Sequence, residues 1–238
     1  GELHLEIQCH RIKTDHNVEV RVGTPRVSYR ESLRSVGEAE HRFDRRLGEK
    51  AHYAVVRLRI EPTGSTSGPG SVEIVNRLPA DTIERRFIPC IETGIRDAAT
   101  TGVIGGYPVI NCRVVIVGAS QHETDSSELA FESAARFAFE EAMKAGGPLL
   151  LQPIMDVEVV TPDDYFGSIV GDLNARGASV RDTEMRGQER VLKADAPLAE
   201  MFGYATKLRS LSQGRATFAM TPSHYAPVSD ARVKAMFG

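Results

Sequence analysis

The stretch HRFDRRLGEKAHY, residues 41–53, stands out in this chain for the charge of its side chains. Only two of them are acidic, whereas four are basic, namely Arg42, Arg45, Arg46 and Lys50. Histidines and aromatic rings stand between them. Because cations neutralise phosphates and rings stack on bases, a basic turn of this kind between two strands can engage RNA. The simpler alternative is the solvated tip of a hairpin, and the segment taken alone favours it.

A second candidate is the polar loop Gln121-His122-Glu123-Thr124, which precedes a predicted helix. That helix is expected to begin after Asp125 as its N-cap, with Glu128 at the third helical position. Its predicted buried stripe repeats at spacings of three and four residues: Phe131, Ala134, Ala135, Ala138 and Ala142. His122 lies before the cap and outside this stripe. By itself it is interpreted as a loop histidine without a task.

The motifs of common catalytic sites are missing from the sequence. There is no Gly-x-Ser-x-Gly and no His-Glu-x-x-His. The glycine-rich stretch TTGVIGGYP, residues 100–108, lacks the Gly-Lys-Ser/Thr ending of a phosphate loop and predicts a turn. The side chains of His4, Cys9, His10 and His16 match no common zinc spacing. We therefore predict no catalytic residue, no cofactor site and no metal site in this chain.

The composition is that of a soluble globular protein with one large or two ordinary domains. The chain has 238 residues, of which 41% are hydrophobic and 26% charged, with a formal net charge of −3. Three well-separated cysteines argue against a disulfide framework and for a reducing compartment. No apolar run is long enough to span a membrane, and no signal-peptide pattern is present.

Periodicity in the first part of the chain predicts mainly strands. Alternating apolar residues indicate strands over 18–22, 27–29, 56–60, 71–76 and 109–117. Ile88, Ile91, Ile95 and Ala98 predict a helix that tolerates Pro89 in its first turn. The opening GELHLEI suits a helix as well as a strand.

After Gly146-Gly147-Pro148, a helix stop signal, the order of elements changes. The patterns predict strand, helix, strand, strand, helix and strand, over 154–162, 163–177, 178–185, 189–196, 197–211 and 215–220. This is the split β-α-β order of a ferredoxin-like domain. We place a domain boundary near residue 149.

The same region carries a resemblance to a known family. PLAEMFGYATKLRSLSQGRATFAM, GSIVGDLNARG and PIMDVEVVTP closely resemble the last domain of elongation factor G, the translocase GTPase of the ribosome. GELHLEI is similar to the end of its third domain, and GYPV and HETDSSELAFESAARFAF are similar to its fourth. The matches keep the family's order over nearly the whole chain. The resemblance implies that Gly1 marks a cut inside a larger protein whose N-terminal part binds GTP and Mg²⁺.

The implied fold is α+β. Residues 1–15 would end the third domain, and residues 16–148 would form the fourth, an α/β arm that reaches the tRNA at the decoding site. That arm would have a left-handed β-α-β crossover like the second domain of ribosomal protein S5, exceptional against the right-handed rule. Residues 149–238 would form the ferredoxin-like fifth domain.

The resemblance also assigns a site at the tip of the fourth domain, where two loops meet the codon–anticodon duplex. The residues carried over are Gln121, His122, Glu123, Thr124, Arg45, Arg46, Gly48 and Lys50. Histidine can stack on RNA or hydrogen-bond with it without the fixed charge of lysine. The first tip loop departs from the family's Ser-Gly-Gly-Arg-Gly-Gln-Tyr, because residues 46–52 keep one glycine in register.

The leading hypothesis is therefore the C-terminal arm of a translational GTPase that promotes tRNA–mRNA translocation. Its partners would be ribosomal RNA of both subunits and the tRNA–mRNA pair, and it would be a monomer in the cytoplasm without a membrane partner. The altered loop leaves open a paralogue for ribosome recycling or ribosome protection. A third alternative, from another class, is an independent RNA-binding module that has no GTPase.

Overall fold

The computed structural model of the chain describes residues 2–19, 23, 25–48, 50–64 and 72–238. By their internal contacts the residues form two compact units. One unit, here called the ferredoxin-like unit, comprises Gly1–Ser28 and Pro153–His224. The other, the hairpin unit, comprises Tyr29–Gln152 and Tyr225–Gly238. Both combine helices with β-sheet, which confirms the predicted α+β class.

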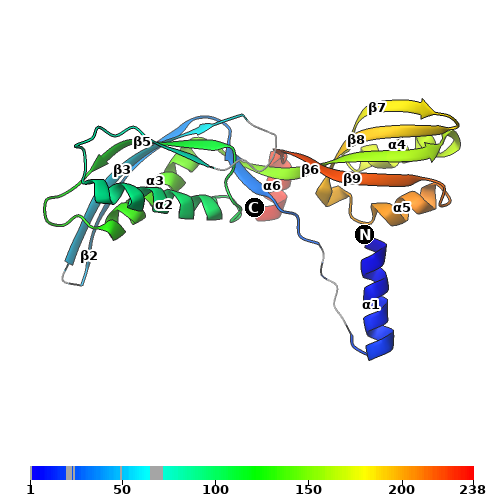
Figure 1. The fold of residues 1–238 in the computed structure, drawn as a ribbon, viewed down its shortest axis with the longest axis horizontal. Helices are drawn as coiled ribbons and strands as arrows, with labels where there is room; N and C mark the ends of the chain where they lie inside the picture. The colour runs from blue at the N-terminus through cyan, green and yellow to red at the C-terminus, as the bar shows by residue number, and fades with distance from the viewer. Residues whose placement is uncertain (1, 20–22, 24, 49, 65–71) are drawn as a thin grey trace. The chain divides into compact units, whose positions relative to one another are not determined.

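The hairpin unit is built on a four-stranded sheet in the order β2-β3-β5-β4. Figure 1 labels β2, β3 and β5 of this sheet. Its strands are β2 (Gly37–Leu47), β3 (Lys50–Pro62), β4 (Glu73–Asn76) and β5 (Cys112–Ser120). Neighbours are antiparallel except β4 and β5, which run parallel and are joined through a helical segment. The strands predicted over 56–60, 71–76 and 109–117 are thus confirmed as elements with shifted ends, and Ser71 lies outside the described residues.

Two helices cover one face of this sheet (Figure 1). They are α2 (Ile88–Thr101), preceded by the short 3₁₀ helix η1 (Arg85–Phe87), and α3 (Glu128–Ala145). Alternate residues of β3 point into the core beneath them and are fully buried: Ala54, Val56, Leu58 and Ile60. All five residues of the stripe predicted on α3 are fully buried as well. The 3.6-residue period thus identified the buried face of the helix that follows the polar loop.

In the N-terminal region the structure decides one open alternative and corrects one prediction. Residues 2–7 lie in a helix, α1 (Glu2–His16), which is one of the two structures that their pattern allowed, whereas the segment around Val27 is not a strand. The first strand is β1 (Arg30–Leu33), which pairs antiparallel with residues 148–151. Val20 and Val22 lie outside the described residues. The two alternating residues Val27 and Tyr29 were too short a pattern, because pairing also needs a partner strand at the right place.

The glycine-rich stretch at 100–108 wraps around a buried carboxylate. Glu31 of β1 is fully buried and accepts hydrogen bonds from successive backbone N–H groups of this loop. The donors are the amides of Val103, Ile104, Gly105 and Tyr107, at 2.6, 3.0, 3.0 and 3.3 Å. Gly102 has φ 57°, and a Cβ atom at this position would lie 2.4 Å from the Glu31 carboxyl carbon, so that any side chain would clash with the carboxylate. The loop is therefore a turn that binds an anion of its own chain.

The ferredoxin-like unit has the predicted split β-α-β order. Its elements are β6 (Pro148–Pro162), α4 (Asp163–Ala175), β7 (Ser179–Arg186), β8 (Glu189–Pro197), α5 (Tyr204–Leu211) and β9 (Thr217–Pro227). β8 lies between β6 and β7, while β9 pairs with β6. The helices pack on the sheet through buried Ile169, Leu173 and Tyr204. The ferredoxin-like prediction is confirmed.

The helix predicted over 197–211 is interrupted. A 3₁₀ turn, η2 (Leu198–Glu200), comes first, and α5 begins only at Tyr204. Gly203 adopts φ 73°, a left-handed conformation that ends one helical segment before the next begins. Phe202, which the pattern placed on the apolar stripe, is exposed at 36% because it precedes this break.

The last residues form a helix that the sequence did not predict, α6 (Asp230–Phe237), and it belongs to the hairpin unit. Asp230 forms an ion pair with Arg34, and the ring of Phe237 lies 6.3 Å from that of Tyr107. The functional domain ranges 1–15, 16–148 and 149–238 stay predictions, because grouping by contacts is not a test of function.

Candidate nucleic-acid interface

The basic stretch at 41–53 forms the free end of the β2–β3 hairpin. The two strands pair continuously from Gly37↔Ile60 to Leu47↔Lys50, so that only residues 48 and 49 connect them. Gly48 adopts φ 66°, which glycine reaches without strain. The hairpin is thus regular up to its two-residue connection. Glu49 lies outside the described residues.

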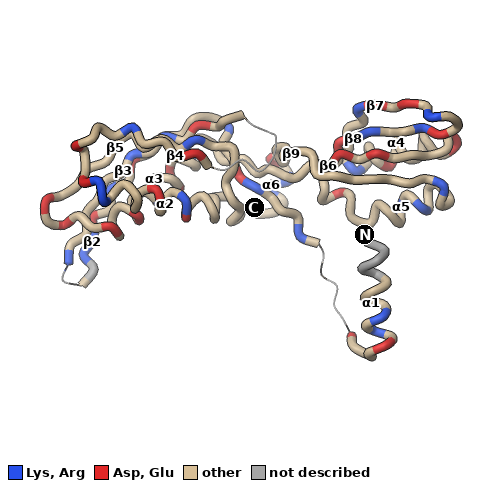
Figure 2. The backbone as a smooth tube through the Cα atoms, in the orientation of Figure 1, with Lys and Arg blue, Asp and Glu red and all other residues tan. Residues whose placement is uncertain are grey.

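The basic side chains of this tip are exposed to solvent, and Figure 2 shows Lys and Arg at the end of the hairpin. Arg42 is hydrogen-bonded to Asp44 at 2.6 Å, and this bond raises the pKa of the guanidinium. Arg45 lies over the ring of Phe43, at 5.9 Å from its centroid. Arg46 and Lys50 form no ion pair with the described residues. The tip therefore presents cations that can bind phosphate.

The polar loop at 121–127 is hydrogen-bonded to the base of this tip. The backbone N–H of Tyr53 donates to the carbonyl of Asp125 at 2.8 Å, and the Ser126 hydroxyl donates to the carbonyl of Tyr53 at 3.0 Å. The backbone N–H of His122 in turn donates to the Ser126 hydroxyl at 2.8 Å. The structure thus brings together the two segments that the sequence singled out separately.

The N-cap of α3 is Ser127, not the predicted Asp125. The Ser127 hydroxyl accepts from the N–H of Ala130 at 3.2 Å, and Glu128 is the first helical residue. Since the carbonyl of Asp125 already pairs with β3, that residue belongs to the docked loop and cannot open the helix. The Ser127 hydroxyl also lies 2.7 Å from Nδ1 of His52, so the cap is attached to the hairpin.

His122 is exposed, with 53% of its side chain accessible, and its ring lies beside that of Tyr53. The ring centroids are 5.9 Å apart at an interplanar angle of 60°. Nδ1 lies 3.4 Å from the N–H groups of Thr124 and Asp125 and 3.5 Å from the Asp125 carboxylate. A neutral imidazole that accepts at Nδ1 carries its proton at Nε2. His122 can therefore donate to an external acceptor.

The other predicted residues of this loop have different surroundings. The side-chain oxygen of Gln121 accepts from the N–H of Glu84 at 2.8 Å, so Gln121 holds the loop to the segment before η1. Glu123 and Thr124 are exposed, and the Thr124 hydroxyl donates to Asp125 at 3.0 Å. Of the four, His122 is the side chain whose position best suits a contact with RNA.

Sequence reasoning missed the residues that join the hairpin to the loop. Arg42, His52 and Tyr53 were noted only as members of a basic, aromatic stretch. The contacts of this stretch with residues 122–127 connect segments that are far apart along the chain, and no local pattern reports such a distance. The signal available in the sequence was the presence of arginines beside aromatic residues in the stretch 41–53, which is typical of cation–π contacts.

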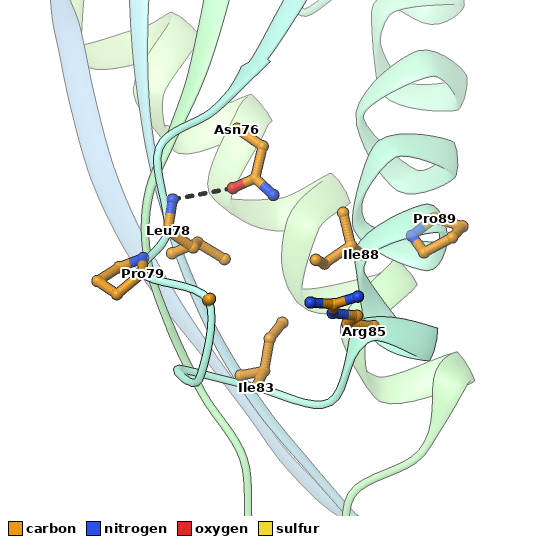
Figure 3. Close-up of a pocket in the computed structure, with 8 residues that line it drawn as sticks. Asn76, Leu78, Pro79, Ile83, Arg85, Ile88 and Pro89 are labelled. Atoms are coloured by element: carbon orange, nitrogen blue, oxygen red, sulfur yellow. Dashed lines mark hydrogen bonds between the residues drawn. The ribbon is translucent and has the colours of Figure 1, made fainter.

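A separate pocket of about 280 Å³ lies between the chain after β4 and the start of α2 (Figure 3). Its walls are mainly apolar, from Leu78, Pro79, Ile83, Ile88 and Pro89. Asn76 accepts from the N–H of Leu78 at 2.9 Å, which closes the turn beside it. Arg85 is the charged residue in the lining that the structure describes. Among the described lining residues there is no pair of side chains that could act as general acid and base.

Two features of other functional classes are absent from the residues that the structure describes. Within them, no group of three or more His, Cys, Asp and Glu side chains is placed to hold a metal ion. Across the same part of the chain, no helix is both long and apolar enough to cross a membrane.

Comparison with known proteins gives the class and then the family. A family model described as elongation factor G, domain IV, matches residues 25–147, and a second, elongation factor G C-terminus, matches residues 149–236. Together with the ferredoxin-like unit and the charged hairpin, these matches define the class as the elongation factors of translation. Within it, the chain belongs to the elongation factor G family.

Individual relatives agree with this assignment. Elongation factor G of Thermotoga maritima is 47% identical over 230 residues, which cover 97% of this chain and 33% of that protein. Elongation factor G of Fervidobacterium nodosum is 49% identical over 230 residues, which likewise cover 97% of this chain and 33% of that protein. A crystal structure of a Thermus thermophilus protein has a TM-score of 0.83 at 34% identity, covering 100% of this chain and 35% of the other. The chain spans about a third of the length of the curated relatives it matches.

Proposed function

We propose that this chain acts as the ribosome-contacting arm of an elongation factor G and promotes the movement of tRNA and mRNA. The observation that carries the proposal is the docking of the exposed His122 loop on the base of the basic hairpin, through Tyr53. A histidine and several cations at one end of the hairpin unit suit an RNA that offers both bases and phosphates.

The rest of the working factor belongs to the same proposal. The GTPase activity, with GTP and Mg²⁺, resides in the part of the protein that precedes this chain. The arm works as a monomer on ribosomal RNA of both subunits and on the tRNA–mRNA pair at the decoding site, in the cytoplasm. Gln121, Glu123 and Thr124 shape the loop, while His122, Arg45, Arg46, Gly48 and Lys50 lie closest to the RNA.

A specific observation favours a second candidate, a factor for ribosome recycling or protection. The hairpin is paired up to Leu47↔Lys50, and its two-residue turn contains one glycine. A short, fully paired tip lets less backbone approach RNA than a glycine-rich loop does. Translocation and recycling are separated by the experiment below, since only the first requires the tip to follow the moving tRNA.

The test uses a chimera in which this chain replaces the matching third of the Thermotoga maritima elongation factor G. In that factor, His122→Ala should slow tRNA–mRNA movement about tenfold, since a ring stacked on a base contributes about 1–3 kcal/mol. GTP hydrolysis stimulated by ribosomes should stay nearly unchanged, because the nucleotide is bound outside this chain. Rapid kinetics of translocation beside phosphate release measure both.

The control in the same assay is stability. His122 is exposed, so its removal should change the free energy of unfolding by no more than about 0.5 kcal/mol. Equal losses in translocation and phosphate release, or no change in either, would rule out His122 as a tip contact. A wild-type chimera that hydrolyses GTP and releases subunits but does not translocate would support the recycling alternative.

Binding of the purified chain to ribosomes should depend steeply on salt. Replacement of Arg45, Arg46 and Lys50 by glutamine should reduce the magnitude of the slope of log K against log salt by about 2–3, since each phosphate contact contributes about 0.7–0.9. Lys144→Gln, an exposed cation on the last turn of α3, should leave the slope unchanged. Tight binding that ignores salt, or GTP hydrolysis by the chain alone, would contradict the proposed function.

A further inference from the structure

The two faces of the β2–β3 hairpin carry different sets of basic residues. Side chains alternate between the faces of a strand, and directly paired residues share a face. Phe43 and Ala54 are paired and buried, so their face lies toward the helices. Arg45, paired with His52, lies on this helix side.

Arg42, Asp44, Arg46 and Tyr53 therefore lie on the opposite, helix-free face. Asp44 is paired directly with Tyr53, and Arg46 with Ala51. The sequence had grouped Arg45, Arg46 and Lys50 as one basic tip. The register separates them. Lys50 lies two residues from His52 on β3 and shares its helix-side face, whereas Arg46 lies on the same face as Tyr53.

Tyr53 is the point at which the helix-free face meets the His122 loop. The guanidinium of Arg42 lies over its ring, at 5.2 Å from the centroid, and the His122 ring lies at 5.9 Å from it. The backbone of the same residue holds Asp125 and Ser126 by two hydrogen bonds. One half-buried ring thus contacts a cation from the hairpin and an imidazole from the loop.

We propose that Tyr53 is a positioning residue that holds Arg42 and His122 on the helix-free face, so that these two side chains and Arg46 bind one RNA segment together. Arg42 and Arg46 face its phosphates, and His122 faces a base or a ribose hydroxyl. Arg45 and Lys50, on the other face, act independently of His122. The inference rests on the proposed function, because it names the surface that the RNA meets.

The structural half of the inference can be tested without a ribosome. In the 238-residue chain, the ¹H–¹³C signal of the His122 ring should shift in Tyr53→Leu, because the ring current of Tyr53 is lost. In Tyr53→Phe, which keeps the ring, the signal should stay near its wild-type position. Circular dichroism checks that both variants fold. An unchanged His122 signal in a folded Tyr53→Leu variant overturns the inference.

The functional half uses the chimeric factor in a double-mutant cycle. We expect Tyr53→Leu and His122→Ala each to slow translocation about tenfold relative to wild type. The double variant should also be only about tenfold slower than wild type, since the two residues act through one contact surface. Tyr53→Phe should restore the rate to within about twofold of wild type. Arg45→Gln is the control on the helix side of the hairpin. In the double variant with His122→Ala, the two fold-reductions in translocation rate should multiply.

The outcomes distinguish the two proposals. If His122→Ala slows translocation and Tyr53→Leu does not, the positioning role is wrong while the proposed function stands. If the slowing by Tyr53→Leu and His122→Ala multiplies, the residues act separately and the shared surface is wrong. If neither variant slows translocation while the chimera is active, the surface around His122 does not bind the RNA and the inference is wrong, whereas the activity of the chimera still supports the ribosome-contacting arm.

Discussion

Phe131→Ala should lower the free energy of unfolding of the hairpin unit by about 3–5 kcal/mol, the usual loss when a buried phenylalanine is truncated. The ring is fully buried on α3 and stacks on Phe87, with centroids 4.5 Å apart and an interplanar angle of 26°. Deleting it removes apolar burial and leaves a cavity between η1, α2 and α3. The neighbouring side chains can fill that space only in part, because they are packed against a sheet on the other side.

Urea denaturation followed by circular dichroism measures this loss, with the transitions of the two units fitted separately. Leu129→Ala is the matched control, since Leu129 is two residues away on the same helix and 48% exposed. It should cost less than about 1 kcal/mol. A loss below that value for Phe131→Ala as well would mean that the ring does not pack in the core.

Glu31→Ala should destabilise the same unit by a comparable amount, about 3–5 kcal/mol, for an electrostatic reason. The carboxylate is buried and forms no ion pair within the part of the chain that the structure describes, and four backbone N–H groups of the loop at 102–107 compensate its charge. Alanine leaves all four donors without the Glu31 carboxylate, and a donor that loses its acceptor in a buried site costs about 1–3 kcal/mol.

Hydrogen exchange at the amides of residues 103–107 reports this effect directly. Exchange there should accelerate strongly in Glu31→Ala, and in Glu31→Gln to a smaller degree, because glutamine keeps one acceptor oxygen but directs an NH₂ group at N–H donors. Glu38→Gln, which breaks an exposed ion pair with Arg57, should change stability by no more than about 1 kcal/mol. Unaltered protection of the loop in Glu31→Ala would show that the carboxylate does not organise it.

The sequence by itself determined the elements whose burial repeats along the chain. On α3, every residue of the stripe from Phe131 to Ala142 is buried, because one helical face meets one core. The strand around Val114 and the order of the ferredoxin-like elements were predictable for the same reason. The family resemblance could likewise be recognised from the sequence, since several long motifs of the family occur in this chain in the family's order.

The sequence did not predict features that depend on contacts between segments far apart in the chain. The N-cap of α3 is Ser127 and not the predicted Asp125, because the residues before Ser127 pair with β3. A glycine in the left-handed conformation at Gly203 divided a helix whose apolar pattern is continuous. The final helix, α6, has too weak an apolar stripe to stand out, and its place in the hairpin unit depends on contacts with residues as distant as Arg34.

The candidate site shows the same division between local and distant information. Composition alone indicated a basic, aromatic tip, since charge and ring content are properties of the residues. Which cations share a surface with His122 was decided by the register of β2 on β3 and by the docking of the loop on Tyr53. A shift of the register by one residue would exchange the two faces of the hairpin without any change in composition. Only the tertiary structure fixes that register, because it is set by the burial of Phe43 and Ala54 against the helices.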